Sequence, residues 1–439
     1  MTLTLQQIAQ ALGVTIAATG IATGWSTDTR TLEPGDLFIA LHGPNHDGHE
    51  HLSTAFEKGA IAAIVDRDIP ATSLAFRVPD TLEALQTLAK WARQQWNGDI
   101  VAVTGSAGKT TTKEIIARLL SSEFKTGKTE GNFNNHVGLP LSILRLPGDT
   151  KIAVLELGMN HAGEIRDLAQ IAKPRIAVVT NVGPAHIENF ANGIEGIAAA
   201  KRELVEALPD KGTAVLNADD PHVAAMHTAH NGKTITYGIV SNANVQARDL
   251  QLHDDHVEFT VEKIKFRSPV AGRHNVLNIL AGIAVGLEYG LALPQLAEAA
   301  TTLPLLKMRG ERKVRNGVTI WDDCYNANPD AMRAMLDVLK DTQANRRIAV
   351  LGEMRELGAW SERLHSDVGR YAASAGIDFL IAIHGDAQYT AAQHPAAQFV
   401  HDPEAAGELL KQIARPGDAI LFKGSRGTHV EKALERYLS

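Results

Sequence analysis

Apolar residues recur along the chain with two spacings, which predict strands that alternate with helices. Four short apolar runs, each followed by a stretch with helical spacing, lie at 100–103, 152–157, 175–182 and 213–219. Strands separated by helices in this way are typical of parallel β–α–β units that are covered on both faces. After Val245 the apolar positions fall on every second residue, which predicts a small antiparallel piece before a helix at 274–289.

The two ends of the chain have their own patterns. The first 80 residues predict short strands at 36–41 and 60–65, with a Gly/His/Pro-rich loop between them, and a helix follows at 81–96. A further alternating set of strands lies at 318–323, 346–354, 379–385 and 419–426. We therefore predict an α/β protein of three domains. They are a small α+β domain (1–80), a central domain with a mostly parallel sheet (81–306) and a Rossmann-like α/β domain (307–439).

Composition and charge narrow the functional classes. Of 439 residues, 43 are Lys or Arg and 50 are Asp or Glu, so the net charge is −7. This balance argues against broad binding to nucleic acid, which needs clustered cationic surface. The single cysteine, Cys324, excludes an intramolecular disulfide and fits a reducing compartment. No apolar run reaches the roughly 18 residues of a membrane span, so we expect a cytoplasmic, monomeric protein without stable membrane insertion.

A glycine-rich turn joins the first central strand to its helix. Residues 104–114 read TGSAGKTTTKE. Gly105 and Gly108 allow backbone amides to approach phosphate oxygens, and the helix N-terminus adds the positive end of its dipole. Lys109 can reach the outer phosphates of a nucleotide, while the Thr110 hydroxyl can bind Mg²⁺.

This motif is a shortened form of the usual phosphate loop. The eight-residue pattern needs glycine at position 103, where this chain has Val103. The alternative interpretation is a tight turn with a capped helix. Because glycine, lysine and threonine all fall where a strand–turn–helix loop requires them, we predict a P-loop ATPase domain at the centre of the chain.

Three further side chains could complete a metal site. Glu156 ends the next strand, and a carboxylate at that edge of a parallel sheet can hold Mg²⁺ against phosphates. His186 follows the strand after it, and Lys201 lies on the succeeding helix. Taken alone, Glu156 could be a surface or capping carboxylate, His186 a structural histidine and Lys201 a solvated lysine.

Several motifs together resemble a known family. TGSAGKTTT (104–112), LELGMN (155–160), NVGPAHIENF (181–190) and AAAKRE (198–203) are similar to the central domain of the Mur ligases. These are ATP-dependent, amide-forming enzymes of peptidoglycan precursor synthesis. The resemblance implies an enzyme of cell-wall biogenesis, with links to cell shape, cell division and the cell cycle.

Three more stretches narrow the resemblance within the family. Residues 26–51 resemble the uridine-nucleotide-binding domain of the later Mur ligases. Residues 131–140 and 322–332 resemble the ligases that add D-alanyl-D-alanine to UDP-N-acetylmuramoyl-tripeptide, the last cytoplasmic step towards the pentapeptide. The DNPR-type signature of the diaminopimelate-adding ligases is absent, and NANP (326–329) stands in that region. The implied partners are these two substrates, and the implied route passes through an acyl phosphate. Another Mur-type or folylpolyglutamate-type ligase, or a P-loop switch that makes no amide, remains an alternative.

The resemblance also assigns roles to residues. It implies catalytic roles for Lys109, Glu156, His186 and Lys201. It implies two Mg²⁺ ions, held by Thr110, Glu156, His186 and, if carbamylated, Lys201. The residues implied for ATP are Gly105, Ser106, Ala107, Gly108, Lys109, Thr110, Thr111, His274, Asn275, Asn278, Arg309 and Asp323. Those implied for the substrates are Ser26, Asp28, Arg30, Gly43, Asp47, Gly48, His49, Asn132, Asn134, Asn135, Tyr325, Asn326 and Asn328.

Some features keep no assigned role. Residues 352–358, His365 and residues 423–426 resemble C-terminal motifs of the same ligases. A general base for the attacking amine is not evident. Four histidines between 42 and 51 raise the alternative of a zinc site, although the glycine and proline around them predict an irregular loop near the uridine nucleotide.

Overall fold

Nine strands form the largest sheet of the computed structural model, which describes residues 1–15, 17–43, 46–69 and 74–439. Their order is β10-β11-β9-β12-β13-β14-β15-β16-β17, and the pairs from β10 to β15 are parallel. The predicted antiparallel piece is confirmed, but it continues the main sheet as β15, β16 and β17. The strands are β9 (Asp99–Thr104), β10 (Thr126–Lys128), β11 (Ile152–Glu156), β12 (Ile176–Val179), β13 (Thr213–Asn217), β14 (Lys233–Gly238), β15 (Val245–Leu252), β16 (Val257–Val261) and β17 (Ile264–Ser268).

Helices cover both faces of this sheet, as the unbroken apolar strands predict. In β9, Val101 and Val103 pack with residues of α4 and α9, whereas Ile100 and Ala102 belong to the core on the opposite face. One layer consists of α4 (Lys109–Leu120), α9 (Arg273–Glu288) and α10 (Leu293–Ala300). The other consists of α3 (Thr81–Gln95), α5 (Gly138–Leu144), α6 (Glu164–Ala172) and α7 (Gly193–Glu206).

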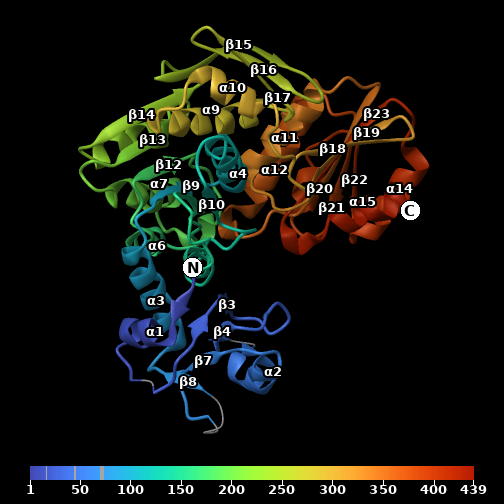
Figure 1. The fold of residues 1–439 in the computed structure, drawn as a ribbon. Coiled ribbons are helices and arrows are strands. Elements are labelled where there is room, and N and C mark those ends of the chain that lie inside the picture. Colours follow the sequence, from blue (N-terminus) through green and yellow to red (C-terminus); the bar gives the residue numbers. More distant parts are fainter. Residues whose placement is uncertain (16, 44–45, 70–73) are drawn as a thin grey trace.

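The C-terminal part contains a six-stranded sheet of order β18-β19-β23-β20-β21-β22 (orange to red in Figure 1). All of its pairs are parallel except the edge pair β18–β19. The strands are β18 (Glu311–Arg315), β19 (Val318–Asp323), β20 (Arg346–Gly352), β21 (Phe379–Ile383), β22 (Ala397–Val400) and β23 (Asp418–Lys423). The helices are α11 (Pro329–Asp341), α12 (Ser361–Ser374), α13 (Ala387–Ala391), α14 (Pro403–Ile413) and α15 (Glu431–Leu438).

The N-terminal part, blue in Figure 1, lies apart from the C-terminal sheet. It combines helices, two short antiparallel pairs and a sheet whose four strands are all parallel. The elements are β1 (Leu3–Thr4), α1 (Leu5–Leu12), β2 (Ile21–Ala22), β3 (Gly24–Ser26), β4 (Asp36–Ile39), β5 (His42–Gly43), β6 (His46–Asp47), η1 (Gly48–His51), α2 (Leu52–Glu57), β7 (Ala62–Val65) and β8 (Ala75–Arg77). Pro44 and Asn45 of the predicted Gly/His/Pro-rich loop lie outside the described residues.

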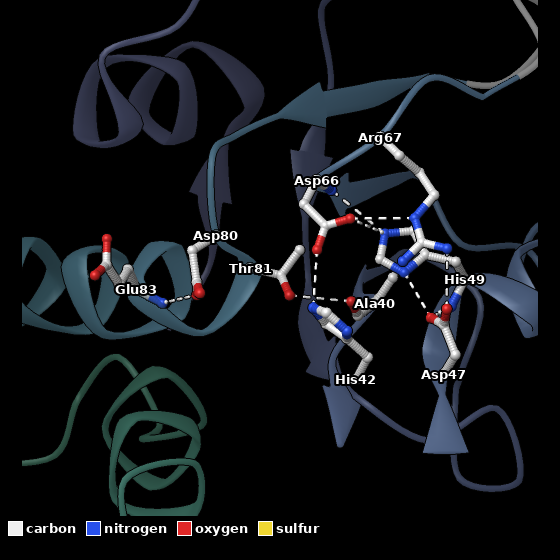
Figure 2. Close-up of polar contacts among 9 residues, drawn as sticks. All are labelled: Ala40, His42, Asp47, His49, Asp66, Arg67, Asp80, Thr81 and Glu83. Carbon is white, nitrogen blue, oxygen red and sulfur yellow. Dashed lines mark hydrogen bonds and ion pairs between the residues drawn. The ribbon is translucent and has the colours of Figure 1, made fainter. Parts of the chain in front are cut away.

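Helix α3 connects this part to the central sheet. Asp80 caps its first turn by accepting a 2.8 Å hydrogen bond from the Glu83 amide, and the Thr81 hydroxyl donates to the Ala40 carbonyl at 3.1 Å (Figure 2). Farther along, α3 packs against α1 on one side and α5 and α6 on the other. The helix therefore fixes the end of β4 relative to the central part. None of the helices in the described ranges is both long and apolar enough to cross a membrane.

Candidate active site

A cavity of about 650 Å³ lies between the carboxyl ends of the central strands and the C-terminal part. Side chains at or just after the carboxyl ends of β9, β11 and β12 contribute to one wall, and side chains at or just after the ends of β19 and β23 contribute to the other. In open parallel sheets this edge is where ligands bind. Predicted site residues in its walls are Ser106, Ala107, Gly108, Lys109, Thr110, Thr111, Asn132, Asn134, Glu156, His186, His274, Asn275, Asn278, Arg309, Asp323, Tyr325, Asn326 and Asn328.

The glycine-rich turn takes the predicted strand–turn–helix form between β9 and α4. A side chain at Gly105 would collide with Thr180 Oγ1, and Gly108 has a φ of 78°, which favours glycine. Asn181, which the sequence analysis did not single out, fixes the turn: its Oδ1 accepts from the Ala107 amide at 2.8 Å. Its carbonyl also accepts from the Ser106 amide at 3.0 Å. The turn is therefore held rigidly before any nucleotide is bound.

Lys109 carries the positive charge of this turn. Its ammonium group donates a 2.8 Å hydrogen bond to the Gly105 carbonyl oxygen. Burial lowers the pKa of Lys109, the positive charge of Arg309 lowers it further, and Glu156 acts in the opposite sense. A phosphate group in the cavity would supply the anion that these cations lack.

Glu156 is held through both of its carboxylate oxygens. The side chain is only 2% exposed. Its Oε2 accepts from the Thr110 hydroxyl at 2.8 Å, and its Oε1 accepts from the Asn134 amide at 2.7 Å. Hydroxyl and carboxylate oxygens are the donors that Mg²⁺ prefers.

Within the described residues, no group of three or more His, Cys, Asp or Glu is placed to hold a metal ion. A metal at Glu156 would therefore take its other ligands from hydroxyl groups, water and nucleotide phosphates. Mg²⁺ commonly binds in this way, through one or two carboxylates together with substrate phosphates.

A buried lysine that the sequence analysis did not single out positions the loop that carries Asn134. Lys113 is fully buried, and its ammonium donates to the Thr129 carbonyl at 2.6 Å and the Gly131 carbonyl at 3.3 Å. Thr129 in turn accepts through its hydroxyl from the Glu156 amide at 3.0 Å. Lys113 thus ties α4 to the loop beside the carboxylate, and its position four residues after Lys109 is the signal that could have indicated this role.

Lys201 lies behind the cavity wall, on α7. It is 3% exposed, and in the described part of the chain its ammonium nitrogen has no hydrogen bond or ion pair. Burial, with a further effect from the nearby charge of Lys109, holds the pKa of Lys201 well below its ordinary value. Burial thus favours the neutral amine of Lys201 over its ammonium form.

His186 lines the cavity from the central part and meets a C-terminal carboxylate. Its Nδ1 is buried and lies within ion-pair distance of Oε2 of Glu356, without the geometry of a hydrogen bond. This pairing holds the pKa of Glu356 below its ordinary value. Glu356 lies in the motif 352–358, whose role the sequence left open.

The C-terminal wall is built from charged and aromatic side chains. Asp323 pairs with the buried Lys423, which also donates to the Asn326 carbonyl at 2.9 Å. The Arg309 guanidinium lies 3.9 Å from the centre of the Tyr325 ring. These side chains suit a nucleotide, since they offer both cations and a flat apolar face.

Two hydrogen-bonded asparagines contact the glycine-rich turn and the helix that follows it. Asn328 caps α11 by accepting from the Ala331 amide at 2.9 Å, and its side-chain amide donates to the Ser106 carbonyl at 3.2 Å. On α9, Asn278 accepts from the Thr112 hydroxyl of α4 at 3.0 Å. The glycine-rich turn is thus contacted from both the central and the C-terminal parts.

The predicted substrate residues of the N-terminal part do not line this cavity. They are Ser26, Asp28, Arg30, Gly43, Asp47, Gly48 and His49. Ser26 is buried and its hydroxyl donates to the Asp28 carbonyl at 2.9 Å. The Asp28 carboxylate pairs with the exposed Arg30 at 2.6 Å, which lowers the pKa of Asp28 to about 2.

His49 joins two carboxylates in this part, as Figure 2 shows. Its Nδ1 lies 2.8 Å from Asp47 and its Nε2 lies 3.2 Å from Asp66, while Arg67 bridges the same two carboxylates at 3.0 and 3.2 Å. Gly48 allows this close packing, because a side chain there would come within 2.7 Å of the Leu41 carbonyl. The cluster anchors the loop after β4 to the end of β7.

The four histidines of this loop do not converge on one point. His42 and His49 both approach Asp66, whereas His46 stacks on His51 with ring centres 5.1 Å apart. Since no three-ligand group occurs among the described residues, the geometry does not support the zinc alternative.

Asn135 lies on a second, smaller cavity of about 340 Å³ between α3 and α6. Its Oδ1 accepts from the Gly138 amide at 2.9 Å at the start of α5. Gly158 belongs to the walls of both cavities. The second cavity therefore adjoins the first on the side of Glu156.

Comparisons with family models, with curated proteins and with solved structures all give Mur ligases. Residues 103–286 match the Mur ligase middle domain, and residues 308–426 match the Mur ligase glutamate ligase domain. The chain is 37% identical to the UDP-N-acetylmuramoyl-tripeptide–D-alanyl-D-alanine ligase of Bacillus subtilis (strain 168), over 94% of this chain and 92% of the relative. A crystal structure of MurF from Acinetobacter baumannii superposes with a TM-score of 0.93 at 31% identity, over 100% of this chain and 99% of the other. MurF ligase from Thermotoga maritima in complex with ADP has a TM-score of 0.86 at 29% identity, over 95% and 97%.

Proposed function

This chain belongs to the UDP-N-acetylmuramoyl-tripeptide–D-alanyl-D-alanine ligases of the Mur ligase family, and we propose that it catalyses the reaction named for them. It is an ATP-dependent ligase that joins D-alanyl-D-alanine to UDP-N-acetylmuramoyl-tripeptide in peptidoglycan synthesis. The observation that carries the proposal is the cavity in which the phosphate-binding turn of the central part faces charged residues of the C-terminal part.

The reaction needs activation, because amide formation from a carboxylate is uphill in water. In the proposed route the terminal carboxylate of the tripeptide attacks the γ-phosphorus of ATP, and ADP leaves. The amine of D-alanyl-D-alanine then attacks the acyl carbon, phosphate leaves, and the amine loses a proton. The first step brings two anions together, so fixed positive charge at the transferred phosphoryl group is the main requirement.

The turn after β9 meets this requirement. We propose that backbone amides of residues 105–111 bind the phosphates and that Lys109 neutralises the transferred group. Asn275 and Asn278 at the start of α9 are proposed to lie towards the base, with His274, whose pKa burial lowers. Arg309 and Asp323 are proposed to contact the ribose and phosphates.

Magnesium is proposed at two positions. Thr110 and Glu156 would hold the first ion, which their oxygen donors fit. His186 and, if carbamylated, Lys201 would hold the second. Bound Mg²⁺ supplies positive charge that stabilises the phosphoryl oxygens during transfer.

Lys201 has the properties that carbamylation requires. The neutral amine adds to CO₂ and releases one proton, which leaves an anionic carbamate on the side chain. Burial favours the neutral amine, and in the described part of the chain no ion pair occupies the side chain. The resulting anion would compensate the nearby charge of Lys109.

Each of the three predicted domains would bind a different ligand or part of a ligand. We propose that residues 1–80 bind the uridine nucleotide through the 26–51 stretch, that 81–306 bind ATP, and that 307–439 contribute ATP and dipeptide contacts. Asn132, Asn134 and Asn135 lie near Gly158, which lines both cavities, and would face the tripeptide. Tyr325, Asn326 and Asn328 would face the dipeptide. We further propose a monomeric enzyme that acts in the cytoplasm.

The direct test is phosphate release with ATP and Mg²⁺ while each substrate is omitted in turn. Release that needs both substrates, with a pentapeptide product identified by mass, is the expected result. Replacing D-alanyl-D-alanine by single amino acids or glutamate tests the other Mur-type and folylpolyglutamate-type ligases. Phosphate release that is indifferent to both substrates would leave an ATP switch and overturn the ligase assignment.

A further inference from the structure

Glu356 is a C-terminal residue that reaches a side chain of the central part. Its carboxylate Oε2 is paired with Nδ1 of His186, and the Glu188 amide donates to the Glu356 carbonyl at 3.4 Å. The short helices η2 (Ile187–Asn189) and η4 (Gly358–Trp360) lie in contact beside this pair. The contact therefore joins the two parts directly at the wall of the cavity.

The loop that carries Glu356 is fixed by buried hydrogen bonds. The Met354 amide donates to Nε2 of the fully buried His365 at 2.9 Å, so the proton of that ring lies on Nδ1, which donates to the Ser361 carbonyl at 2.9 Å. The next amide, that of Arg355, donates to the Ser425 hydroxyl at 3.0 Å. The position of Glu356 is thus set by the C-terminal sheet and α12.

Both partners of the pair have an unusual backbone conformation. His186 has a φ of 59° and Glu356 has a φ of 64°, in the left-handed region that residues other than glycine seldom adopt. Such conformations concentrate at functional sites, where the surrounding structure maintains them. Two of them meeting in one contact indicate that this contact has a role beyond packing.

We propose that Glu356 is a positioning residue for the metal-binding nitrogen of His186. A carboxylate on one ring nitrogen holds the proton there and leaves the lone pair of the other nitrogen for a metal ion, a common arrangement around metal-binding histidines. In the described part of the chain the ion-pair contact of His186 is made by Nδ1, whereas Nε2, on the ring that lines the cavity, has neither a hydrogen bond nor an ion pair. This inference rests on the proposed role of His186 as a metal ligand.

The proposal makes the second metal site depend on contact between the C-terminal and central parts. Because Glu356 comes from that part and His186 from the central part, the histidine is oriented only while the two are docked. Docking of the C-terminal part thus completes the second metal site, and the site is incomplete in a form in which the parts have separated. The reaction is thereby linked to the closed arrangement, in which water is also excluded from the acyl phosphate.

Binding of Mn²⁺ to the full chain tests the proposal. The free ion is measured by electron paramagnetic resonance in the presence of a non-hydrolysable ATP analogue. We expect Glu356→Ala to weaken Mn²⁺ binding at one site by about 10-fold, the usual effect of losing such a partner. Glu356→Gln should retain most of the affinity, because its amide oxygen can still accept from Nδ1.

Three further variants and measurements distinguish the outcomes. Glu188→Gln, which removes an exposed carboxylate at the same interface, should bind Mn²⁺ like the wild type. If His186→Ala weakens binding and Glu356→Ala does not, the positioning role of Glu356 is wrong while the metal assignment stands. If His186→Ala has no effect, the metal assignment itself fails, and the positioning role with it. Thermal unfolding of each variant verifies that it is folded.

Discussion

Asn134 and Glu156 are joined by a 2.7 Å hydrogen bond although 22 residues separate them in the chain. The amide of Asn134 occupies one carboxylate oxygen, and the Thr110 hydroxyl occupies the other. The carboxylate of a buried glutamate is thereby fixed in one orientation at the end of β11. Glu156 can hold a metal ion against a nucleotide only if this orientation is maintained.

Replacing Asn134 should therefore act on the rate. A hydrogen bond to a charged group contributes about 1.5–3 kcal/mol, so we expect Asn134→Ala to lower kcat about 10-fold or more. Because Asn134 is also proposed to face the tripeptide, a smaller rise in the KM for UDP-N-acetylmuramoyl-tripeptide should accompany this loss in steady-state assays. A raised KM with unchanged kcat would show that Asn134 contacts the substrate but does not position Glu156.

Lys109 should be the most sensitive residue of the phosphate-binding turn. Removing one preorganised electrostatic contact typically costs 10²–10³ in rate, and we expect a loss of about this size in kcat for Lys109→Met. Lys125→Met is a suitable control, since that lysine is exposed and pairs with Asp149 at the surface. Equal losses in both variants would point to a general effect of charge and would contradict the assigned role.

The parts of the fold that depend on local pattern could be predicted from the sequence. The glycine-rich turn, the long helices and the buried parallel strands are each encoded by consecutive residues. The short or edge strands β10, β18 and β22 were not predicted, because three to five residues carry little periodicity. Nor could the pattern show that β15 joins the main sheet, since pairing partners are not a local property.

For the candidate site, too, the sequence predicts features that depend on position along the chain and does not predict contacts between distant residues. Residues adjacent to a strand end, such as Glu156, are found by position along the chain. The contacts of Asn181, Lys113 and Glu356 are made between side chains and distant backbone or side-chain groups. Only the folded arrangement reveals them, because the motifs that contain these residues do not specify their partners.

His49 provides a test of the N-terminal part. Its ring is 5% exposed and lies between Asp47 and Asp66, so its removal should loosen the loop after β4. We expect His49→Ala to raise the KM for UDP-N-acetylmuramoyl-tripeptide several-fold while kcat and the KM for ATP stay near wild type. His51→Ala, in the same loop but without a carboxylate partner among the described residues, is the matched control. An effect confined to kcat would exclude a role in binding the nucleotide.

Lys201 should make the enzyme sensitive to CO₂. Carbamate formation consumes CO₂ and releases a proton, so activity in CO₂-depleted buffer should fall towards low pH and recover when bicarbonate is added. Lys201→Ala should lose about 10- to 100-fold in activity, the scale for groups that support a metal site, and bicarbonate should not restore it. Full activity in Lys201→Ala would remove the residue from the site.

His365 should contribute to the pH dependence of stability. Burial lowers its pKa from 6.5, so as the pH falls below about 6.5 the unfolded chain binds a proton at this ring before the folded chain does. The contribution of His365 to the free energy of unfolding is therefore fully present above about pH 6.5. It decreases as the pH falls below that value, and it stops decreasing once the pKa of the folded state is passed. We expect His365→Gln, whose amide oxygen can still accept from Met354, to show a smaller decrease in the free energy of unfolding between pH 7.5 and pH 5, measured by urea denaturation.

The control is His401→Gln, on a histidine exposed at the surface. This variant should keep the wild-type dependence of the free energy of unfolding on pH. Equal slopes in the wild type and His365→Gln would mean that His365 does not take part in this linkage.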